Sequence, residues 1–169
     1  MEEYGNRLNE IRDTFAPQAE AAWIEFLALP APTLEDLETL ANREVAIRSQ
    51  LEIEVRELDP PEALADLHDV LADWITSLRR VGTALADRAG AGGSWDELLQ
   101  SAEYQAYEST LIGGATVCNE FQAELDATEA RGAFADAPWI PGEMKEVADA
   151  VIGCGDIPED LDPVLGRQQ

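Results

Sequence analysis

The chain has 169 residues and a formal net charge of −24, because 35 aspartates and glutamates outnumber 11 lysines and arginines. This length suits one domain that buries roughly two-thirds of the surface its unfolded form exposes. The electrostatic field of such a negatively charged chain repels nucleic acid and anionic membrane faces, so we expect no nucleic-acid partner. No 18 apolar residues follow one another, so we also expect no transmembrane segment.

Apolar residues recur at spacings of three and four, which is typical of helices that each bury one stripe, and strand-like alternation is nearly absent. The first helix is expected to kink near Asp13, because Pro17 has no backbone N–H to donate. Its stripe consists of Tyr4, Leu8, Ile11, Phe15, Ala22 and Leu29, with Trp23 and Phe26 beside it.

Helix start signals divide the rest of the chain. Thr33 and Asp36 predict a second helix that runs to about Leu58, and Asp59 before two prolines predicts the cap of a third. The stripe of the third helix consists of Leu64, Leu67, Leu71, Trp74, Leu78, Val81 and Leu85. Ser94 and Glu97 form a capping box before a fourth long helix. Its stripe consists of Tyr104, Tyr107, Leu111, Gly114, Cys118, Phe121, Leu125 and Thr128.

The C-terminal part of the chain is expected to complete a helical bundle. Phe134 and Trp139 lie in a loop that we expect to cover the open end, and Gly155 is expected to end a short fifth helix. The apolar side of that helix consists of Met144, Val147, Val151 and Cys154. The sequence therefore predicts an all-α fold, an antiparallel up-and-down four-helix bundle with a short fifth C-terminal helix. The domain spans residues 1–155, and residues 156–169 form an acidic extended or disordered tail.

Two adjacent glycines, Gly113 and Gly114, interrupt the fourth helix, and each costs about 1 kcal/mol relative to alanine. One interpretation is that a large side chain, such as that of Trp23 or Trp74, packs against the bare backbone. The other is that the missing side chains leave a cavity between helices, where bundles commonly bind ligands.

The two cysteines, Cys118 and Cys154, both fall on apolar helix faces, which makes them candidates for a disulfide. A bridge would indicate an oxidising compartment and hence export. The alternative is two buried thiols in a cytoplasmic protein. The first residues, MEEYGNRLNEI, lack the features of a signal peptide, so an exported protein would have its signal outside this chain.

Glu44 falls near the centre of the apolar face of the second helix, where an unpaired carboxylate would cost several kcal/mol. Arg48, one turn later, is the expected partner, either in an ion pair at the margin of the core or with the helix turned so that Glu44 reaches water. The alternative is a polar anchor in a ligand pocket. The candidate ligand-binding residues are Glu44, Arg48, Tyr104, Tyr107, Gly113 and Gly114.

We expect no catalytic or metal site and no cofactor. His68 is the single histidine, the chain has no second histidine for a di-iron carboxylate site, and no triad motif accompanies it. His68 is expected at the boundary of the core with one hydrogen bond. An acidic stripe could attract calcium, but such stripes are usually solvated faces. It consists of Glu62, Asp66, Asp69 and Asp73.

The segment VRELDPPEALADLHDVL, residues 55–71, resembles uncharacterised alanine-rich helical-bundle proteins and lipoproteins exported by high-GC bacteria. The shared features are a double proline between two long helices and a cysteine near the C-terminal end, here in VIGCG. The resemblance implies an exported bundle and no particular activity. This chain has no cysteine in its first helical segment, where such proteins often carry one.

Together these features predict a non-enzymatic, exported bundle that binds a small molecule or a surface component in an interhelical cavity. The alternative is a structural or protein–protein interaction module without a pocket. The sequence does not determine its oligomeric state.

Overall fold

The computed structural model describes residues 2–152 and is all-helical over that range, with six α-helices, one 3₁₀ turn and no strand. The elements are α1 Glu2–Leu27, α2 Leu34–Arg56, η1 Glu62–Leu64, α3 Ala65–Gly90, α4 Trp95–Leu99, α5 Ala102–Ala130 and α6 Ile140–Ile152. The predicted all-α fold is confirmed at this level. Within residues 2–152, no helix combines the length and the apolar character needed to cross a membrane.

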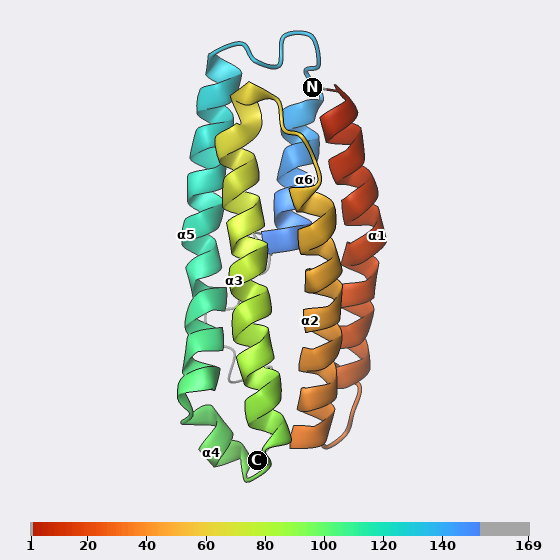
Figure 1. The fold of residues 1–169 in the computed structure, drawn as a ribbon, viewed down its shortest axis with the longest axis vertical. Coiled ribbons are helices and arrows are strands. Elements are labelled where there is room, and N and C mark those ends of the chain that lie inside the picture. The colour runs from red at the N-terminus through yellow and green to blue at the C-terminus, as the bar shows by residue number, and fades with distance from the viewer. Residues whose placement is uncertain (1, 153–169) are drawn as a thin grey trace.

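Four long helices, α1, α2, α3 and α5, lie side by side along the long axis of the molecule (Figure 1). Helix α2 packs against both α1 and α3, and α3 also packs against α5. Helix α6 contacts α1, α3 and α5, so it lies within the bundle alongside the long helices. The six helices therefore form one packed assembly.

The predicted start signals at Thr33 and Ser94 are both capping boxes in the structure, but the second begins a short helix. Thr33 caps α2 through a reciprocal pair of hydrogen bonds with Asp36, and Ser94 caps α4 in the same way with Glu97. Helix α4 ends after five residues, and Ser101 then caps α5 by accepting a hydrogen bond from the Tyr104 backbone N–H. The expected single fourth helix is therefore two helices, because a second N-cap residue starts a new one.

The predicted start of the third helix at Asp59 is wrong. Pro61 instead precedes a single 3₁₀ turn, and α3 begins at Ala65 without a side-chain cap. Helix α2 ends at Arg56, slightly before the predicted end, whereas α1 continues through Pro17 as one helix.

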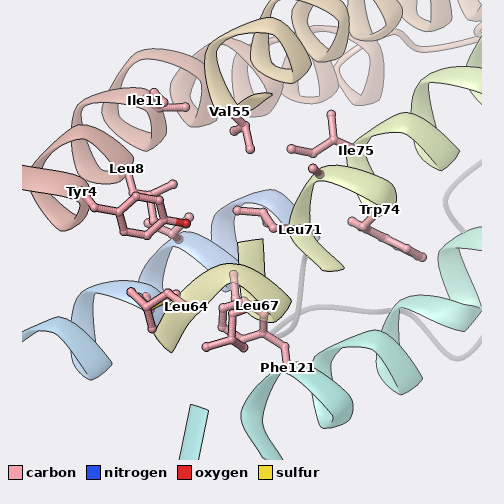
Figure 2. Close-up of a cluster of buried hydrophobic side chains, with 14 of the residues drawn as sticks. Tyr4, Leu8, Ile11, Val55, Leu64, Leu67, Leu71, Trp74, Ile75 and Phe121 are labelled. Atoms are coloured by element: carbon pink, nitrogen blue, oxygen red, sulfur yellow. The ribbon is translucent and has the colours of Figure 1, made fainter. Parts of the chain in front are cut away.

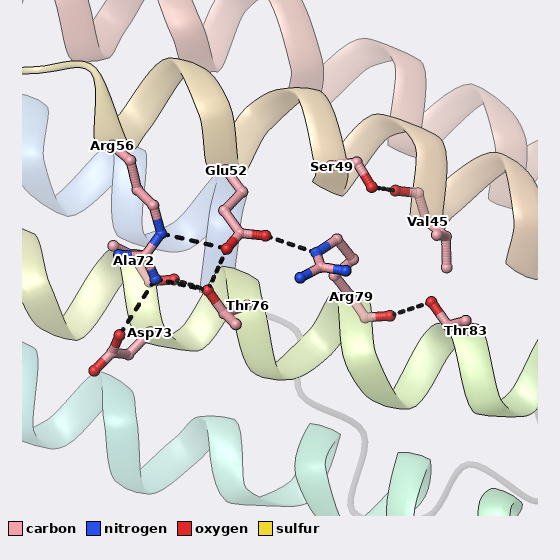
Figure 3. A network of polar contacts seen from close by, with 9 residues as sticks. All are labelled: Val45, Ser49, Glu52, Arg56, Ala72, Asp73, Thr76, Arg79 and Thr83. Atoms are coloured by element: carbon pink, nitrogen blue, oxygen red, sulfur yellow. Dashed lines mark hydrogen bonds and ion pairs between the residues drawn. The ribbon is translucent and has the colours of Figure 1, made fainter.

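The predicted stripe of the third helix is buried along its whole length. Figure 2 shows its first four residues, Leu64, Leu67, Leu71 and Trp74, within the core. The core has two parts. The larger one joins α1, α2, α3, α5 and α6, and the smaller one lies between the other ends of the long helices and includes Leu98 of α4. On the surface, Glu52, Arg56, Asp73, Thr76 and Arg79 link α2 to α3 in a network of hydrogen bonds and ion pairs (Figure 3).

The connection between α5 and α6 runs over the end of the bundle where α1 begins (Figure 1). Phe134 is buried in the larger core cluster, and Trp139 is 38% exposed and lies against Gly5. The expected side chains of α6, Met144 and Val147, are buried. The side chain of Val151, together with Cys154, Gly155 and the predicted tail at 156–169, lies outside the described residues.

Candidate functional site

Glu44 lies on the buried face of α2 and is only 3% exposed. Its neighbours on that face are the apolar residues Leu40, Ala41 and Ile47. A carboxylate in such a place must be paired and hydrogen-bonded, since burying it alone would cost several kcal/mol. The contacts around Glu44 therefore decide whether this part of the bundle is stable.

Three donors from three helices surround the Glu44 carboxylate. The Trp23 indole nitrogen on α1 donates to Oε1 at 2.6 Å, and Arg48 Nη1 donates to Oε2 at 2.5 Å. The Tyr107 hydroxyl on α5 also donates to Oε2, at 3.5 Å. The predicted ion pair between Glu44 and Arg48 is thus confirmed, and the alternative in which Glu44 turns toward water is wrong.

The charges in this cluster stabilise one another. Burial, the largest single effect, lowers the pKa of the Arg48 guanidinium, but the interactions with Glu44 and Tyr107 together outweigh it. The net shift is upward, so Arg48 stays protonated. Burial, and then the negative charge of Glu44, raise the pKa of the Tyr107 hydroxyl. Tyr107 therefore stays neutral and keeps its proton to donate to Glu44.

A cavity of about 50 Å³ lies between α1 and α2, beside this cluster. Its lining consists of Arg12, Phe15, Ala16 and Ala19 from α1 and Glu44, Ile47, Arg48 and Leu51 from α2. Each of the two helices contributes both apolar and charged side chains to this lining. A concave site with an apolar wall and a few fixed polar groups is typical of small-molecule binding sites.

Arg12 connects the rim of this cavity to α6. Its Nε and Nη2 donate to Asp13, at 3.0 and 2.9 Å, and its Nη1 donates to Glu146 at 2.5 Å. Glu143 lies 3.7 Å from the same Nη1. Arg12 is thus held by carboxylates on two helices, and its position depends on the packing of α6 against α1.

A second hollow, of about 180 Å³, lies between the same two helices nearer their connecting loop. Arg43 on its edge is 42% exposed and pairs with Glu25, which is 66% exposed. The ion pair at this hollow is exposed, whereas the smaller cavity is lined by the buried pair of Glu44 and Arg48. We therefore take the smaller cavity as the candidate site.

The structure brings together three of the six predicted ligand-binding residues, Glu44, Arg48 and Tyr107. Tyr104 is buried one turn before Tyr107, in the smaller core cluster. Gly114 is buried and Gly113 half-buried, and neither lines the cavity described above. A Cβ placed on Gly113 would have no neighbour within 4 Å, so packing does not require a glycine there.

Sequence reasoning placed Trp23 beside a stripe and missed its contact with Glu44. The sequence feature that could have predicted this contact is the short connection between α1 and α2, because it makes the two helices neighbours. The lining positions 12, 15, 16 and 19 lie as far before that connection as 51, 48, 47 and 44 lie after it. An antiparallel pairing of the two segments would have predicted which residues meet.

Cys118 is half-buried and packs against the larger core cluster. Cys154 lies outside the described residues, so the disulfide between them stays a prediction. Within residues 2–152, no three histidine, cysteine, aspartate or glutamate side chains converge in a way that would hold a metal ion.

His68 is 7% exposed, deeper than the predicted boundary position, and its Nδ1 lies 3.1 Å from the Tyr4 hydroxyl. The predicted hydrogen bond is confirmed. Burial lowers the pKa of His68, and the charge of Arg56 adds to this, while Asp69 opposes it. Burial also raises the pKa of Tyr4, so a neutral hydroxyl and a neutral imidazole share this hydrogen bond.

Comparison of the chain with protein-family models, with curated proteins and with solved structures finds no match. The resemblance to exported bundles of high-GC bacteria therefore stays an expectation from the sequence.

We predict that Glu44→Leu lowers the free energy of unfolding by about 3–5 kcal/mol, because it leaves the Arg48 charge buried without a partner. Glu44→Leu combined with Arg48→Leu should cost less than the sum of the two single changes. Urea denaturation measures all three. The exposed pair Arg7 and Glu10 is the control, since Glu10→Leu should change stability by less than about 1 kcal/mol. Additive losses at Glu44 and Arg48 would contradict this account.

We also predict that acidification from pH 7.5 to 5.5 destabilises the native chain more than a His68→Gln variant. The pKa of His68 is lower in the folded state than in the unfolded state, so the unfolded chain binds the proton more readily. The stability that neutral His68 contributes is present above its unfolded pKa and is lost as the pH falls. Urea denaturation of both proteins at the two pH values measures the loss of stability of each. Carboxylates common to both proteins contribute equally to these losses, so their difference reports on His68. Parallel pH profiles would show that His68 does not titrate in this way.

Proposed function

We propose that this protein is a non-enzymatic, exported helical bundle that binds a small molecule in the cavity between α1 and α2. Its proposed architecture is an antiparallel up-and-down four-helix bundle of α1, α2, α3 and α5, with α6 as the short fifth helix, over residues 1–155. The packing of each long helix against the next and the short connection between α1 and α2 support this arrangement.

The observation that carries the binding proposal is the buried ion pair of Glu44 and Arg48 at the edge of a cavity. Trp23 and Tyr107 donate hydrogen bonds to Glu44, and Glu44 accepts one from Arg48, so a polar group is fixed in position beside apolar lining residues. Binding sites need polar groups whose orientation is set before the ligand arrives, because ordering them afterwards costs affinity.

The non-catalytic role rests on the chemistry of the groups at the cavity. The lining offers two guanidiniums and one carboxylate, and that carboxylate already accepts three hydrogen bonds. Neither an activated nucleophile nor a general base can be assembled from these groups. His68 is engaged with Tyr4 and is not part of the cavity lining.

A second candidate function is association with another protein or with a second copy of the chain. Ile24 and Leu27 favour it, because they lie three residues apart on α1 and are 59% and 56% exposed. Light scattering that shows a dimer, and a monomer after Leu27→Glu, would support association in place of ligand binding.

The binding proposal predicts that fragments of four to seven heavy atoms perturb the NMR cross-peaks of the Trp23 indole N–H and of residues lining the cavity. A panel of neutral, anionic and cationic fragments makes this test independent of ligand charge. Ala16→Leu fills the cavity and should abolish the shifts, whereas Ala123→Leu, at an exposed position on α5, should leave them unchanged. A panel in which no fragment perturbs these cross-peaks would refute the binding proposal.

Export predicts a disulfide between Cys118 and Cys154, since such bonds persist in oxidising compartments. Protein purified without reductant should show no reactive thiol when titrated in denaturant and two after reduction. Two thiols before reduction would instead favour the cytoplasmic alternative.

A further inference from the structure

The two guanidiniums at the cavity, those of Arg12 and Arg48, differ in how many of their nitrogens donate hydrogen bonds. Each of the three nitrogens of Arg12 has a carboxylate partner. Arg48, by contrast, donates from Nη1 to Glu44, and within residues 2–152 its Nε and Nη2 make no hydrogen bond. The side chain of Arg48 is 17% exposed and lines the cavity. Arg48 is therefore the group at the cavity with N–H donors to spare.

Glu44, in contrast, has little to offer a ligand. Its Oε1 accepts from Trp23, its Oε2 accepts from Arg48 and Tyr107, and the residue is 3% exposed. At most one lone pair, on Oε1, remains free, and it belongs to a residue that is almost fully buried. A cationic ligand in the cavity would therefore mainly face the N–H donors of Arg48. Donors placed against donors disfavour an ammonium group.

The charges around the cavity also disfavour an anion. The positive charge of Arg48 is already compensated by Glu44 at 2.5 Å. At the rim, Arg12 is surrounded by Asp13, Glu143 and Glu146. These six groups are two guanidiniums and four carboxylates, a net charge of −2, in a chain whose net charge is −24. An anion would gain an Arg48 hydrogen bond but no net positive field.

The remaining lining sets the size and the apolar part of the ligand. Phe15 from α1 and Ile47 and Leu51 from α2 are buried core side chains that form the apolar part of the lining. A volume of about 50 Å³ corresponds to about four water-sized groups, since about one probe sphere of 10–15 Å³ holds one water. The ligand is therefore a short molecule.

We propose that this cavity binds a small neutral molecule that has an oxygen acceptor and a short hydrocarbon chain, of the amide, ketone or alcohol class. The oxygen accepts from the spare N–H groups of Arg48, and the hydrocarbon chain contacts Phe15, Ile47 and Leu51. This assignment rests on the proposed function, because it names the chemical class of ligand for the same cavity.

Three probes of matched shape test the ligand class: propionamide, propionate and propylammonium. Each is titrated into isotopically labelled protein at pH 7 and 0.15 M sodium chloride, and the Arg48 Nε–H and Trp23 indole N–H cross-peaks are followed. We expect propionamide to bind with a dissociation constant at least about 10-fold lower than either charged probe, a difference of about 1.4 kcal/mol.

A variant links the binding to Arg48 itself. Arg48→Lys keeps a positive charge beside Glu44 but removes the planar donors, so it should weaken propionamide binding at least about 10-fold while the folded spectrum is kept. Arg43→Lys, on the exposed part of the same helix, is the matched control and should bind as the native protein does.

Propionate or propylammonium binding at the same cross-peaks as tightly as propionamide would overturn the ligand class and leave the proposed function standing. Unchanged propionamide affinity in Arg48→Lys would overturn the role of Arg48. If neither these probes nor the wider fragment panel shift the cavity cross-peaks, the proposed function itself fails.

Discussion

The burial of one carboxylate constrains the structure around the candidate site. Glu44 lies on the apolar face of α2 and is 3% exposed, so every stable arrangement must bring donors to it. The bundle does this with Trp23 from α1, Arg48 from α2 itself and Tyr107 from α5. The three helices are therefore tied at one level by polar contacts as well as by apolar packing, and a rotation of any of them would break a contact. Such satisfied polar networks favour one packing arrangement over its alternatives.

The cavity follows from the same constraint. Arg48 is drawn toward Glu44, and small residues, Ala16 and Ala19, face this level from α1. Short side chains there leave space that the neighbouring Phe15 and Leu51 do not fill. The result is a fixed, charge-compensated guanidinium beside apolar side chains from both helices. This explains why we infer a ligand that is neutral overall, even though the cavity is lined by charged residues.

The cavity is also coupled to the C-terminal helix. Arg12 on its rim pairs with Glu143 and Glu146 of α6, and the larger core cluster includes Met144 and Val147 of the same helix. On the other side, the network around Glu52 fixes α2 against α3. The wall formed by α2 is therefore held by α3, and the wall formed by α1 is held by α6. A binding site built on packed helices is held more rigidly than one built on loops.

The sequence by itself determined the helical class, the stripes that became the core and the ion pair of Glu44 with Arg48. These are local properties, since spacings of three and four and an i, i+4 pair are fixed by the geometry of one helix. The tertiary structure alone decided that Trp23 reaches Glu44, that a side chain at Gly113 would meet no neighbour and that the cavity lies between α1 and α2. It also decided that Ser101 caps α5 as a helix separate from α4 and that α6 lies among the long helices. These features depend on the register and rotation of one helix against another, which many residues far apart in the chain set together and which no single segment encodes.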